Sequence, residues 1–402
     1  MKTSCSVLVV GGGLVGTSLA IALDQAGIDV ILVEARSRPV STQADPEERN
    51  LALARASVNG LRHLGVWRHA ASEATPIRSI QVSRQGVFGS ARLQASAIGV
   101  DALGYTLPAR VLGAALAARL GECTRVRHRV PAKVIDFESE ASGWRVRLAG
   151  EKPAERLYAG LLVGADGTSS SVRDALGIGT DDYDYEQVLM VGTVRTDRSL
   201  EGRAFERFTG KGPVALLPLA QGRTGLVLTV SVAEAEAVAA MDERNYLQLA
   251  QARFGWRMGR FVQAGRRQVW PIRRVAAQSI CASRAVLVGN AAQTIHPIGA
   301  QGFNLGLRDA LTLAELLAVA DDPGAESLLT EYATRRKPDR DGVMRMSHGL
   351  VRLACLPEPA WHPLYSLGLG IAGQLSPLRH AILRRGMGFR GHPPQAVVES
   401  LP

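Results

Sequence analysis

One glycine-rich segment near the N-terminus constrains the fold more than any other part of the chain. It has the spacing Gly11-x-Gly13-x-x-Gly16 and follows the apolar run Ser6–Val10, which is typical of a buried strand. A segment of helical composition comes next, and a second apolar run, Val30–Val33, comes after that. This order predicts a β-α-β unit with parallel strands and a right-handed crossover.

The three glycines and an acid after the second run together indicate a dinucleotide site. The first glycine permits a tight turn, the second lets a pyrophosphate approach the backbone, and the third lets the helix pack on the sheet. Leu14 and Val15 begin the helix, whose free N–H groups hold phosphates. Glu34 ends the second strand, where a carboxylate accepts hydrogen bonds from ribose hydroxyls and repels a 2′-phosphate. We therefore expect NAD or FAD at this site, and not NADP.

In two later segments an apolar strand is again followed by small residues that leave the backbone accessible. Residues 161–177 read LLVGADGTSSSVRDALG and place Asp166 directly after a strand. Residues 286–309 read VLVGNAAQTIHPIGAQGFNLGLRD, in which small residues, Gly and Pro separate a strand from a helix. Backbone exposed in this way at a strand-to-helix junction is suited to close contact with a flat, polar group.

These three motifs, in this order, resemble the FAD-dependent aromatic hydroxylases, the flavoprotein monooxygenases related to 4-hydroxybenzoate hydroxylase. The resemblance covers about residues 5–345. Longer matches at 202–219, 253–259 and 332–340 indicate the ubiquinone-biosynthesis branch, and the 2-octaprenyl-6-methoxyphenol hydroxylase type within it. One departure is Asn290, which stands where the wider family has Asp; an amide still accepts a hydrogen bond from a sugar hydroxyl.

The resemblance implies roles for the residues of these motifs. Gly11, Gly13, Leu14, Val15, Gly16 and Glu34 would hold the ADP half of FAD, and Asn290 would face its sugar chain. Arg49 would reach the pyrophosphate or else be an ordinary surface arginine, Arg110 would lie on the cofactor side, and Asp166 would serve FAD and the nicotinamide cofactor. The isoalloxazine ring would be lined by Pro297, beside its reactive edge, and by Gly299, Ala300, Gln301, Gly302, Phe303 and Asn304. His296 is expected to be structural and is not proposed as a base.

The family's chemistry implies an FAD-dependent monooxygenase. NAD(P)H, a transient co-substrate, reduces FAD; the reduced flavin forms a hydroperoxide with dioxygen and hydroxylates a (poly)prenylated phenol in ubiquinone biosynthesis. The catalytic step therefore belongs to the flavin and is assigned to no side chain. Two alternatives stay open. One is a related FAD oxidoreductase, such as a prenyl reductase, an amine oxidase or another aromatic hydroxylase; the other is a non-catalytic flavin-binding accessory subunit of a biosynthetic complex.

The expected fold class is α/β, with a Rossmann-like FAD-binding domain, an inserted and mostly antiparallel β-sheet substrate domain and a helical C-terminal region. The order of elements assigns 1–75, 101–179 and 276–345 to the first, 76–100 and 180–275 to the second, and 346–402 to the third. Locally, the composition predicts one helix over Leu51–Leu64 and another over Ala233–Arg253.

Charge and cysteine content limit the partners and the compartment. The net charge of +10 comes from dispersed arginines, which favours a phosphate-rich cofactor or anionic lipid and argues against nucleic acid. The four cysteines have no metal-ligand spacing and are expected to be free thiols in a reducing compartment. No secretory signal or long apolar span is present, so we expect a cytoplasmic protein. Peripheral attachment to the inner membrane face, through the Arg-flanked apolar C-terminal region, and contact with other quinone-biosynthesis enzymes are further expectations.

Overall fold

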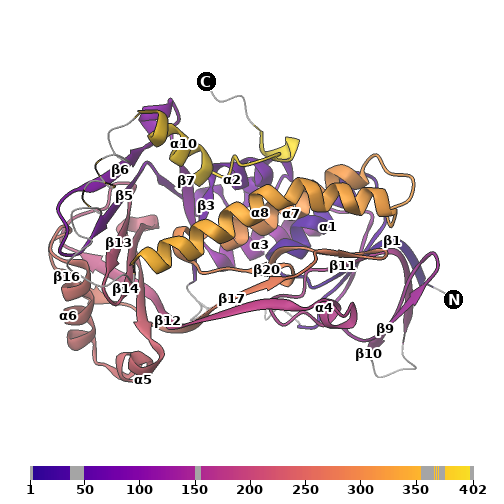
Figure 1. Cartoon of the computed structure of the whole chain (residues 1–402), viewed down its shortest axis with the longest axis horizontal. Coiled ribbons are helices and arrows are strands. Elements are labelled where there is room, and N and C mark those ends of the chain that lie inside the picture. Colours follow the sequence, from indigo (N-terminus) through magenta and orange to yellow (C-terminus); the bar gives the residue numbers. More distant parts are fainter. Residues whose placement is uncertain are drawn as a thin grey trace.

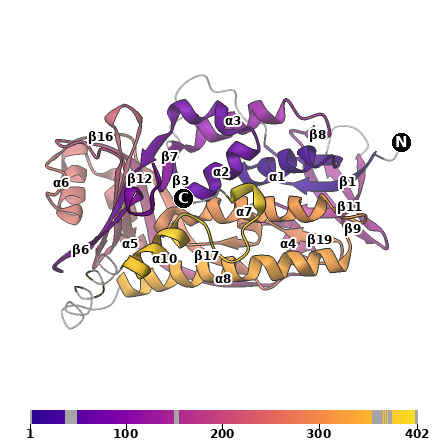
Figure 2. The same ribbon diagram turned by 90° about the horizontal axis from the view of Figure 1, so that it is seen from above.

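Two large sheets lie along the long axis of the molecule, with helices on their faces (Figure 1). The computed structural model describes residues 3–36, 49–149, 155–354 and 376–398, together with residues 366, 368 and 370. Two long helices, α7 (Gln301–Leu317) and α8 (Glu326–Ala354), pack on each other, and α8 contacts strands of both sheets. In the view from above, α8 runs along most of the length of the protein (Figure 2).

The first sheet contains the predicted β-α-β unit and is parallel at its centre. Its order is β18-β19-β11-β1-β2-β8, with β10 and β9 added as an antiparallel pair beside β11. Helix α1 crosses from β1 to β2, as expected, and packs against α3 and α7. The bounds are β1 Thr3–Val10, α1 Leu14–Gln25, β2 Val30–Val33, α3 Ala109–Leu120, β8 Val126–Arg129, β9 Lys133–Glu140, β10 Gly143–Ala149, β11 Arg156–Gly164, β18 Cys281–Ala282 and β19 Ala285–Leu287.

The second sheet is mostly antiparallel and has one face covered by helices. Its order is β20-β17-β12-β15-β14-β13-β5-β6, with β16 paired to β12, and among the strands that the structure describes here only β13 and β5 run parallel. Helices α5 and α6 cover one face and close an apolar core with it. The bounds are β5 Ser79–Arg84, β6 Ser90–Gln94, β12 Thr180–Thr196, β13 Arg203–Thr209, β14 Gly212–Pro218, β15 Thr224–Ser231, α5 Val232–Ala240, α6 Glu243–Phe254, β16 Phe261–Ala264, β17 Gln268–Ala277 and β20 Gln293–Thr294.

Two helix predictions were wrong in their extent. Leu51–Leu64 begins as strand β3 (Asn50–Ala54) and becomes helix α2 (Arg55–His63) only afterwards. β3 pairs with β7 (Gly104–Pro108), which also pairs with β4 (Thr75–Ile77), so a partner distant in sequence overrides the helical composition. The segment Ala233–Arg253 is two helices, because the Asp242 side chain accepts a hydrogen bond from the N–H of Asn245 and so caps the start of α6.

The remaining elements are short helices and the C-terminal helix. They are η1 Trp67–His69, η2 Ala71–Glu73, η3 Ala95–Ile98, α4 Ser171–Ala175, η4 Ala220–Gly222, η5 Gly289–Ala291, η6 Ile298–Ala300, α10 Ser376–Gly386 and η7 Gln395–Val397. The predicted α/β fold class, with a second, mostly antiparallel sheet and C-terminal helices, is confirmed. Among the described residues, no helix combines the length and the apolar character needed to cross a bilayer.

Three of the four cysteines, Cys5, Cys123 and Cys281, are free thiols, and Cys355 lies outside the described residues. Burial raises the pKa of Cys5 and of Cys281 to about 12. Burial also raises the pKa of Cys123, to about 11, so all three thiols are protonated and unreactive near neutral pH.

Candidate functional site

The glycine loop between β1 and α1 has two positions where only glycine fits and one that is open. Gly11 has φ +107°, and a Cβ there would lie 2.5 Å from the carbonyl oxygen of Ala165. A Cβ at Gly16 would lie 1.9 Å from the carbonyl oxygen of Gly11. At Gly13 no atom lies within 4 Å, so this backbone borders free space beside the start of a helix. This arrangement fits a pyrophosphate that approaches the loop at Gly13.

Glu34 is held at the end of β2, next to the same loop. Its Oε2 accepts a hydrogen bond from the N–H of Gly12 at 2.7 Å, and its Oε1 accepts one from the N–H of Arg36 at 2.8 Å. Each carboxylate oxygen has a second lone pair. The side chain is therefore fixed in position and can still accept from a ribose hydroxyl.

Asp166 lies against the glycine loop, and its carboxylate caps a short helix. A Cβ at Gly11 would come within 2.8 Å of the Cα of Asp166. Asp166 Oδ2 accepts from the N–H of Ser171 at 2.7 Å and from its hydroxyl at 2.9 Å. These bonds fix α4, whose Arg173 donates to the carbonyl of Ala291 at 3.2 Å. The second motif thereby connects the first motif to the third.

Val15 brings the first and third motifs into direct contact. A Cβ at Gly289 would lie 3.1 Å from the Val15 side chain, and one at Gly306 would lie 2.8 Å from it. Because both positions are glycine, α1 and α7 approach closely and Val15 packs between α7 and the turn η5. Asn290 lies in that turn with an exposed side chain. The Gly11–Gly16 loop and the late Gly-rich segment therefore belong to one region of the molecule.

The start of α7 presents backbone without a side-chain cap. Gly299 and Ala300 both have left-handed backbone, with φ +68° and +51°, and the N–H of Ala300 donates to the carbonyl of Pro297 at 2.8 Å. Ala300 is the N-cap residue but has no side chain that could accept from the first turn. An added Cβ at Gly299 or at Gly302 would meet no atom within 4 Å. The positive end of a 17-residue helix therefore faces open space, where it can stabilise negative charge.

Asn304 uses its side chain to hold the protein itself. Its Oδ1 accepts from the N–H of Ala54 at 2.8 Å, and its Nδ2 donates to the carbonyls of Ala52 at 2.9 Å and Ala300 at 2.7 Å. The side chain is buried, and both amide hydrogens are engaged. Asn304 therefore ties β3 to the start of α7, and Gln301 is also turned back, with its Nε2 donating to the carbonyl of Gly299 at 3.1 Å. Phe303 packs against the main core.

Arg49 and Arg110 lie at the same end of a small third sheet, which consists of β3, β7 and β4. Asn50 is paired with Pro108, and the N–H of Ala109 donates to the carbonyl of Arg49 at 2.8 Å. Both arginines are exposed. The guanidinium carbon of Arg49 lies 5.3 Å from the centroid of the Trp270 ring of β17, so this arginine contacts the second sheet.

His296 is buried between the second sheet and α8. Its ring is edge-on to Tyr185, with centroids 4.9 Å apart, and its Nδ1 accepts from the N–H of Ile298 at 3.1 Å. Burial lowers the pKa of His296 to about 4, so the ring is neutral near pH 7. The Tyr185 hydroxyl also lies 3.2 Å from Nδ1 of His348 on α8. These contacts fix the backbone that leads into Pro297.

A buried ion cluster, made of Arg308, Asp309, Arg336 and Asp339, supports the turn at Gly289. Asp339 accepts from Arg308 Nε at 2.7 Å and from Arg336 Nη2 at 2.8 Å. Arg336 Nε donates to Asp309 at 2.7 Å, and the other Asp309 oxygen accepts from the N–H of Gly289 at 3.2 Å. None of the four side chains is more than 3% exposed. The sequence assigned them no role, because only the packing of α7 on α8 brings them together.

Glu206 is a second residue that the sequence did not single out. Glu206 of β13 lies opposite Ala215 of β14, and Ala215 lies opposite Val227 of β15. Val227 in turn lies opposite Val191 of β12. Directly opposed residues share a face of a sheet. Val191 and Val227 pack in the cluster that includes Trp270, so Glu206 lies on the Trp270 face and not on the face covered by α5 and α6. Burial raises the pKa of Glu206 to about 8.

Comparisons with known proteins find a family model and similar chains. The family model described as FAD binding domain matches residues 4–347. The ubiquinone hydroxylase UbiL of Rhodospirillum rubrum is 33% identical over 389 residues, covering 95% of this chain and 89% of the relative. The 3-demethoxyubiquinol 3-hydroxylase of Escherichia coli is 32% identical over 394 residues, covering 95% of this chain and 98% of the relative.

A solved structure supports the fold alone. The p-nitrophenol 4-monooxygenase PnpA from Pseudomonas putida DLL-E4 superposes with a TM-score of 0.80 at 21% identity, covering 96% of this chain and 99% of that one. The two chains therefore share their arrangement of sheets and helices over nearly their whole length.

Proposed function

The chain belongs to the FAD-binding-domain family of aromatic monooxygenases, and from that premise we propose that it hydroxylates the ring of a prenylated phenol in ubiquinone biosynthesis. The observation that carries this proposal is the 33% identity to a ubiquinone hydroxylase over 95% of the chain. The enzyme is an FAD-dependent flavoprotein, and NAD(P)H is the reductant typical of its family. FAD, when bound, supplies electron transfer from the nicotinamide and activation of dioxygen.

The proposed FAD site uses the residues assembled above. The open backbone at Gly13 and the start of α1 bind the pyrophosphate, and Glu34 accepts from the adenosine ribose. Arg49 or Arg110, together at the end of the third sheet, reaches the pyrophosphate from the other side. Asn290 accepts from or donates to the ribityl hydroxyls from its turn beside Val15.

The start of α7 is proposed to face the isoalloxazine ring. Gly299, Ala300 and Gly302 leave space for a flat ring, and the uncapped N–H groups of the first turn stabilise negative charge on it. In this arrangement Asn304 acts indirectly, because its side chain holds β3 and Ala300 in place. Pro297 is exposed and lies between the buried His296 and this turn.

The Trp270 face of the second sheet is proposed to cover the substrate ring. Arg49 contacts this face from the third sheet, and His296 contacts it from the segment before α7. Leu189, Val191 and Val227 make the face apolar, which excludes water from the ring. Glu206 is an ionisable group on the same face; with a pKa of about 8 its carboxyl is protonated at neutral pH and donates a hydrogen bond to an oxygen substituent of the substrate.

The test is a product assay with labelled dioxygen. Purified enzyme loaded with FAD is given NADH or NADPH and a short-chain prenylated phenol, and the product is analysed by mass spectrometry. Incorporation of one heavy oxygen atom into the ring supports the proposal. A product with a saturated prenyl chain and no heavy oxygen would identify a reductase, and flavin binding without turnover would identify an accessory subunit.

The enzyme is further proposed to act at the cytoplasmic face of a membrane, alongside other enzymes of the same pathway. This location is supported by the hydrophobic character of a prenylated phenol, which partitions into lipid. In gently lysed cells, raising the salt concentration should move the enzyme from the membrane fraction to the supernatant.

A further inference from the structure

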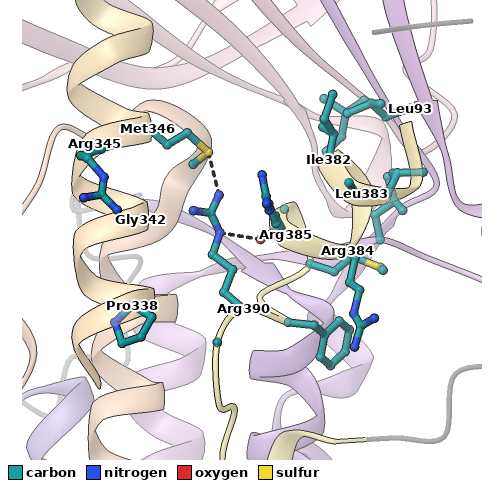
Figure 3. Close-up of a pocket in the computed structure, with 17 residues that line it drawn as sticks. Leu93, Pro338, Gly342, Arg345, Met346, Ile382, Leu383, Arg384, Arg385 and Arg390 are labelled. Atoms are coloured by element: carbon teal, nitrogen blue, oxygen red, sulfur yellow. Dashed lines mark hydrogen bonds between the residues drawn. The ribbon is translucent and has the colours of Figure 1, made fainter. Parts of the chain in front are cut away.

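A cavity of about 770 Å³ lies between α8, α10 and the β5–β6 hairpin (Figure 3). Ile80 and Leu93, which are directly opposed across the hairpin, form its sheet wall. Ile382 and Leu383 of α10 and Met346 of α8 contribute further apolar side chains. A space of this size and lining is suited to a hydrocarbon chain.

The polar side chains among the described lining residues are all cationic. Four arginines contribute to it, namely Arg345 from α8, Arg384 and Arg385 from α10, and Arg390 from the segment that follows. Among the described residues that line the cavity there is no aspartate or glutamate. Across the described ranges, no ion pair engages Arg345, Arg384 or Arg385. The cavity therefore combines an apolar interior with positive charge that the protein itself leaves uncompensated.

Arg390 is held inside this arrangement. It reaches from the C-terminal segment toward α8, where its Nη2 donates to the sulfur of Met346 at 2.9 Å and its Nε donates to the carbonyl of Arg385 at 3.4 Å (Figure 3). Gly342 makes room for it, since a Cβ there would lie 3.1 Å from Arg390 Nη1. Burial lowers the pKa of Arg390, and the attraction of Asp339 opposes this effect, while the smaller repulsions from Arg308 and Arg385 add to it. An anion at this position would offset the burial of this charge and its repulsion by Arg385.

We propose that this cavity binds an anionic phospholipid of a membrane surface, with an acyl chain between α10 and the β5–β6 hairpin and the phosphate at Arg384, Arg385 and Arg390. Charge complementarity selects this occupant. The proposed substrate is a neutral phenol and carries no charge that could pair with several arginines. A dinucleotide would place its polar sugars against apolar walls. The net charge of +10 attracts the protein to the same kind of surface. The proposal does not depend on which ring the enzyme hydroxylates.

The first experiment is flotation of the full-length, FAD-loaded protein with vesicles. Vesicles of phosphatidylcholine containing phosphatidylglycerol are compared with vesicles of phosphatidylcholine alone. The double variant Arg384→Gln/Arg385→Gln is expected to lose about 25-fold in partitioning to the anionic vesicles, from about a factor of five per arginine. The matched control Arg244→Gln/Arg257→Gln removes two exposed arginines elsewhere and should retain most of the binding. Equal losses in the two double variants would show diffuse attraction and overturn the proposal.

The second experiment separates the cavity from the surface charge. Titration with dioctanoyl-phosphatidylglycerol, kept below its micelle concentration, should saturate at one lipid per chain. Ala381→Trp, which fills the cavity, should weaken that binding at least about tenfold while flavin absorbance and melting temperature are retained. If the tryptophan destabilises the protein, Arg384→Gln/Arg385→Gln tests the same point. A neutral prenylated phenol is tested in the same way. If Ala381→Trp abolishes its binding and the arginine variant leaves it unchanged, the cavity holds the substrate tail instead. No saturable binding of the short-chain lipid would also overturn the proposal.

Discussion

Removing the charge of Asp339 should destabilise the protein far more than removing the charge of Asp341, two residues further along α8. Asp339 is 1% exposed and is bonded to both Arg308 and Arg336, whereas Asp341 forms an exposed pair with Lys337 at 3.0 Å. In Asp339→Asn the shape is preserved, but Arg308 stays buried without a counterion. Breaking a buried pair in this way costs about 3–5 kcal/mol, against about 0.3–0.5 kcal/mol for an exposed pair on one helix.

The expected change in melting temperature follows from the size of the protein. Unfolding entropy of about 2.1 cal/mol/K per residue gives about 0.84 kcal/mol/K for 402 residues, so a loss of about 4 kcal/mol lowers Tm by about 5 °C. Asp341→Asn should lower Tm by about 0.5 °C on the same basis. Differential scanning calorimetry of the FAD-free proteins measures both. Equal shifts for the two variants would refute the idea that the buried ion cluster is tightly coupled.

The pH dependence gives a second check on the same residue. Burial raises the pKa of Asp339, but the attraction of Arg308 and Arg336 outweighs it and leaves the pKa below the ordinary value of 3.8. A depressed pKa contributes stability that is fully present above the unfolded value and is lost as the pH falls through the folded one. The gap in stability between wild type and Asp339→Asn should therefore be constant above about pH 4 and shrink only in stronger acid.

Three further outcomes are expected. Gly13→Ala should leave the Tm of the FAD-free protein unchanged and weaken FAD binding at least about tenfold. Gly16→Ala should also lower Tm, because its Cβ would lie 1.9 Å from the carbonyl oxygen of Gly11. Equal FAD affinity in wild type and Gly13→Ala would count against a pyrophosphate at this loop. Ala300→Gly should stabilise the FAD-free protein by up to about 1 kcal/mol in urea unfolding, because φ is +51° there, and a loss of stability would contradict the strain. Relative to Glu206→Gln, wild type should lose stability as the pH rises from 4.5 to about 8, since a raised pKa favours the fold only while the carboxyl is protonated, and parallel stability curves would refute the burial of this charge.

Local patterns were sufficient for the first motif. Gly11, Gly16 and Glu34 act within one strand, one turn and one helix, so their spacing alone predicted the β-α-β unit and the acid beside the loop. The same reasoning failed for Leu51–Leu64, whose first residues are a strand because β7 lies beside them. Intrinsic preference is weak compared with a ladder of hydrogen bonds to a distant partner.

The site contains contacts that span most of the chain. Asn304 bonds to Ala54, 250 residues away, and Arg308 bonds to Asp339, 31 residues away, through the packing of α7 on α8. Glu206 could not be assigned to a face from its own strand, because alternation shows that two faces exist but not which one meets the third sheet. The roles of these residues became visible only with their neighbours.

The sequence by itself determined the fold class, the dinucleotide loop and the bare backbone before α7, because each depends on the conformational limits of glycine and on periodicity over a few residues. Tertiary structure alone decided that Asn304 positions backbone, that four charged side chains share one buried cluster, and that unpaired arginines surround an apolar cavity. The physical reason is that a side chain's partners are set by how helices and sheets pack, and packing joins residues whose separation along the chain carries no signal.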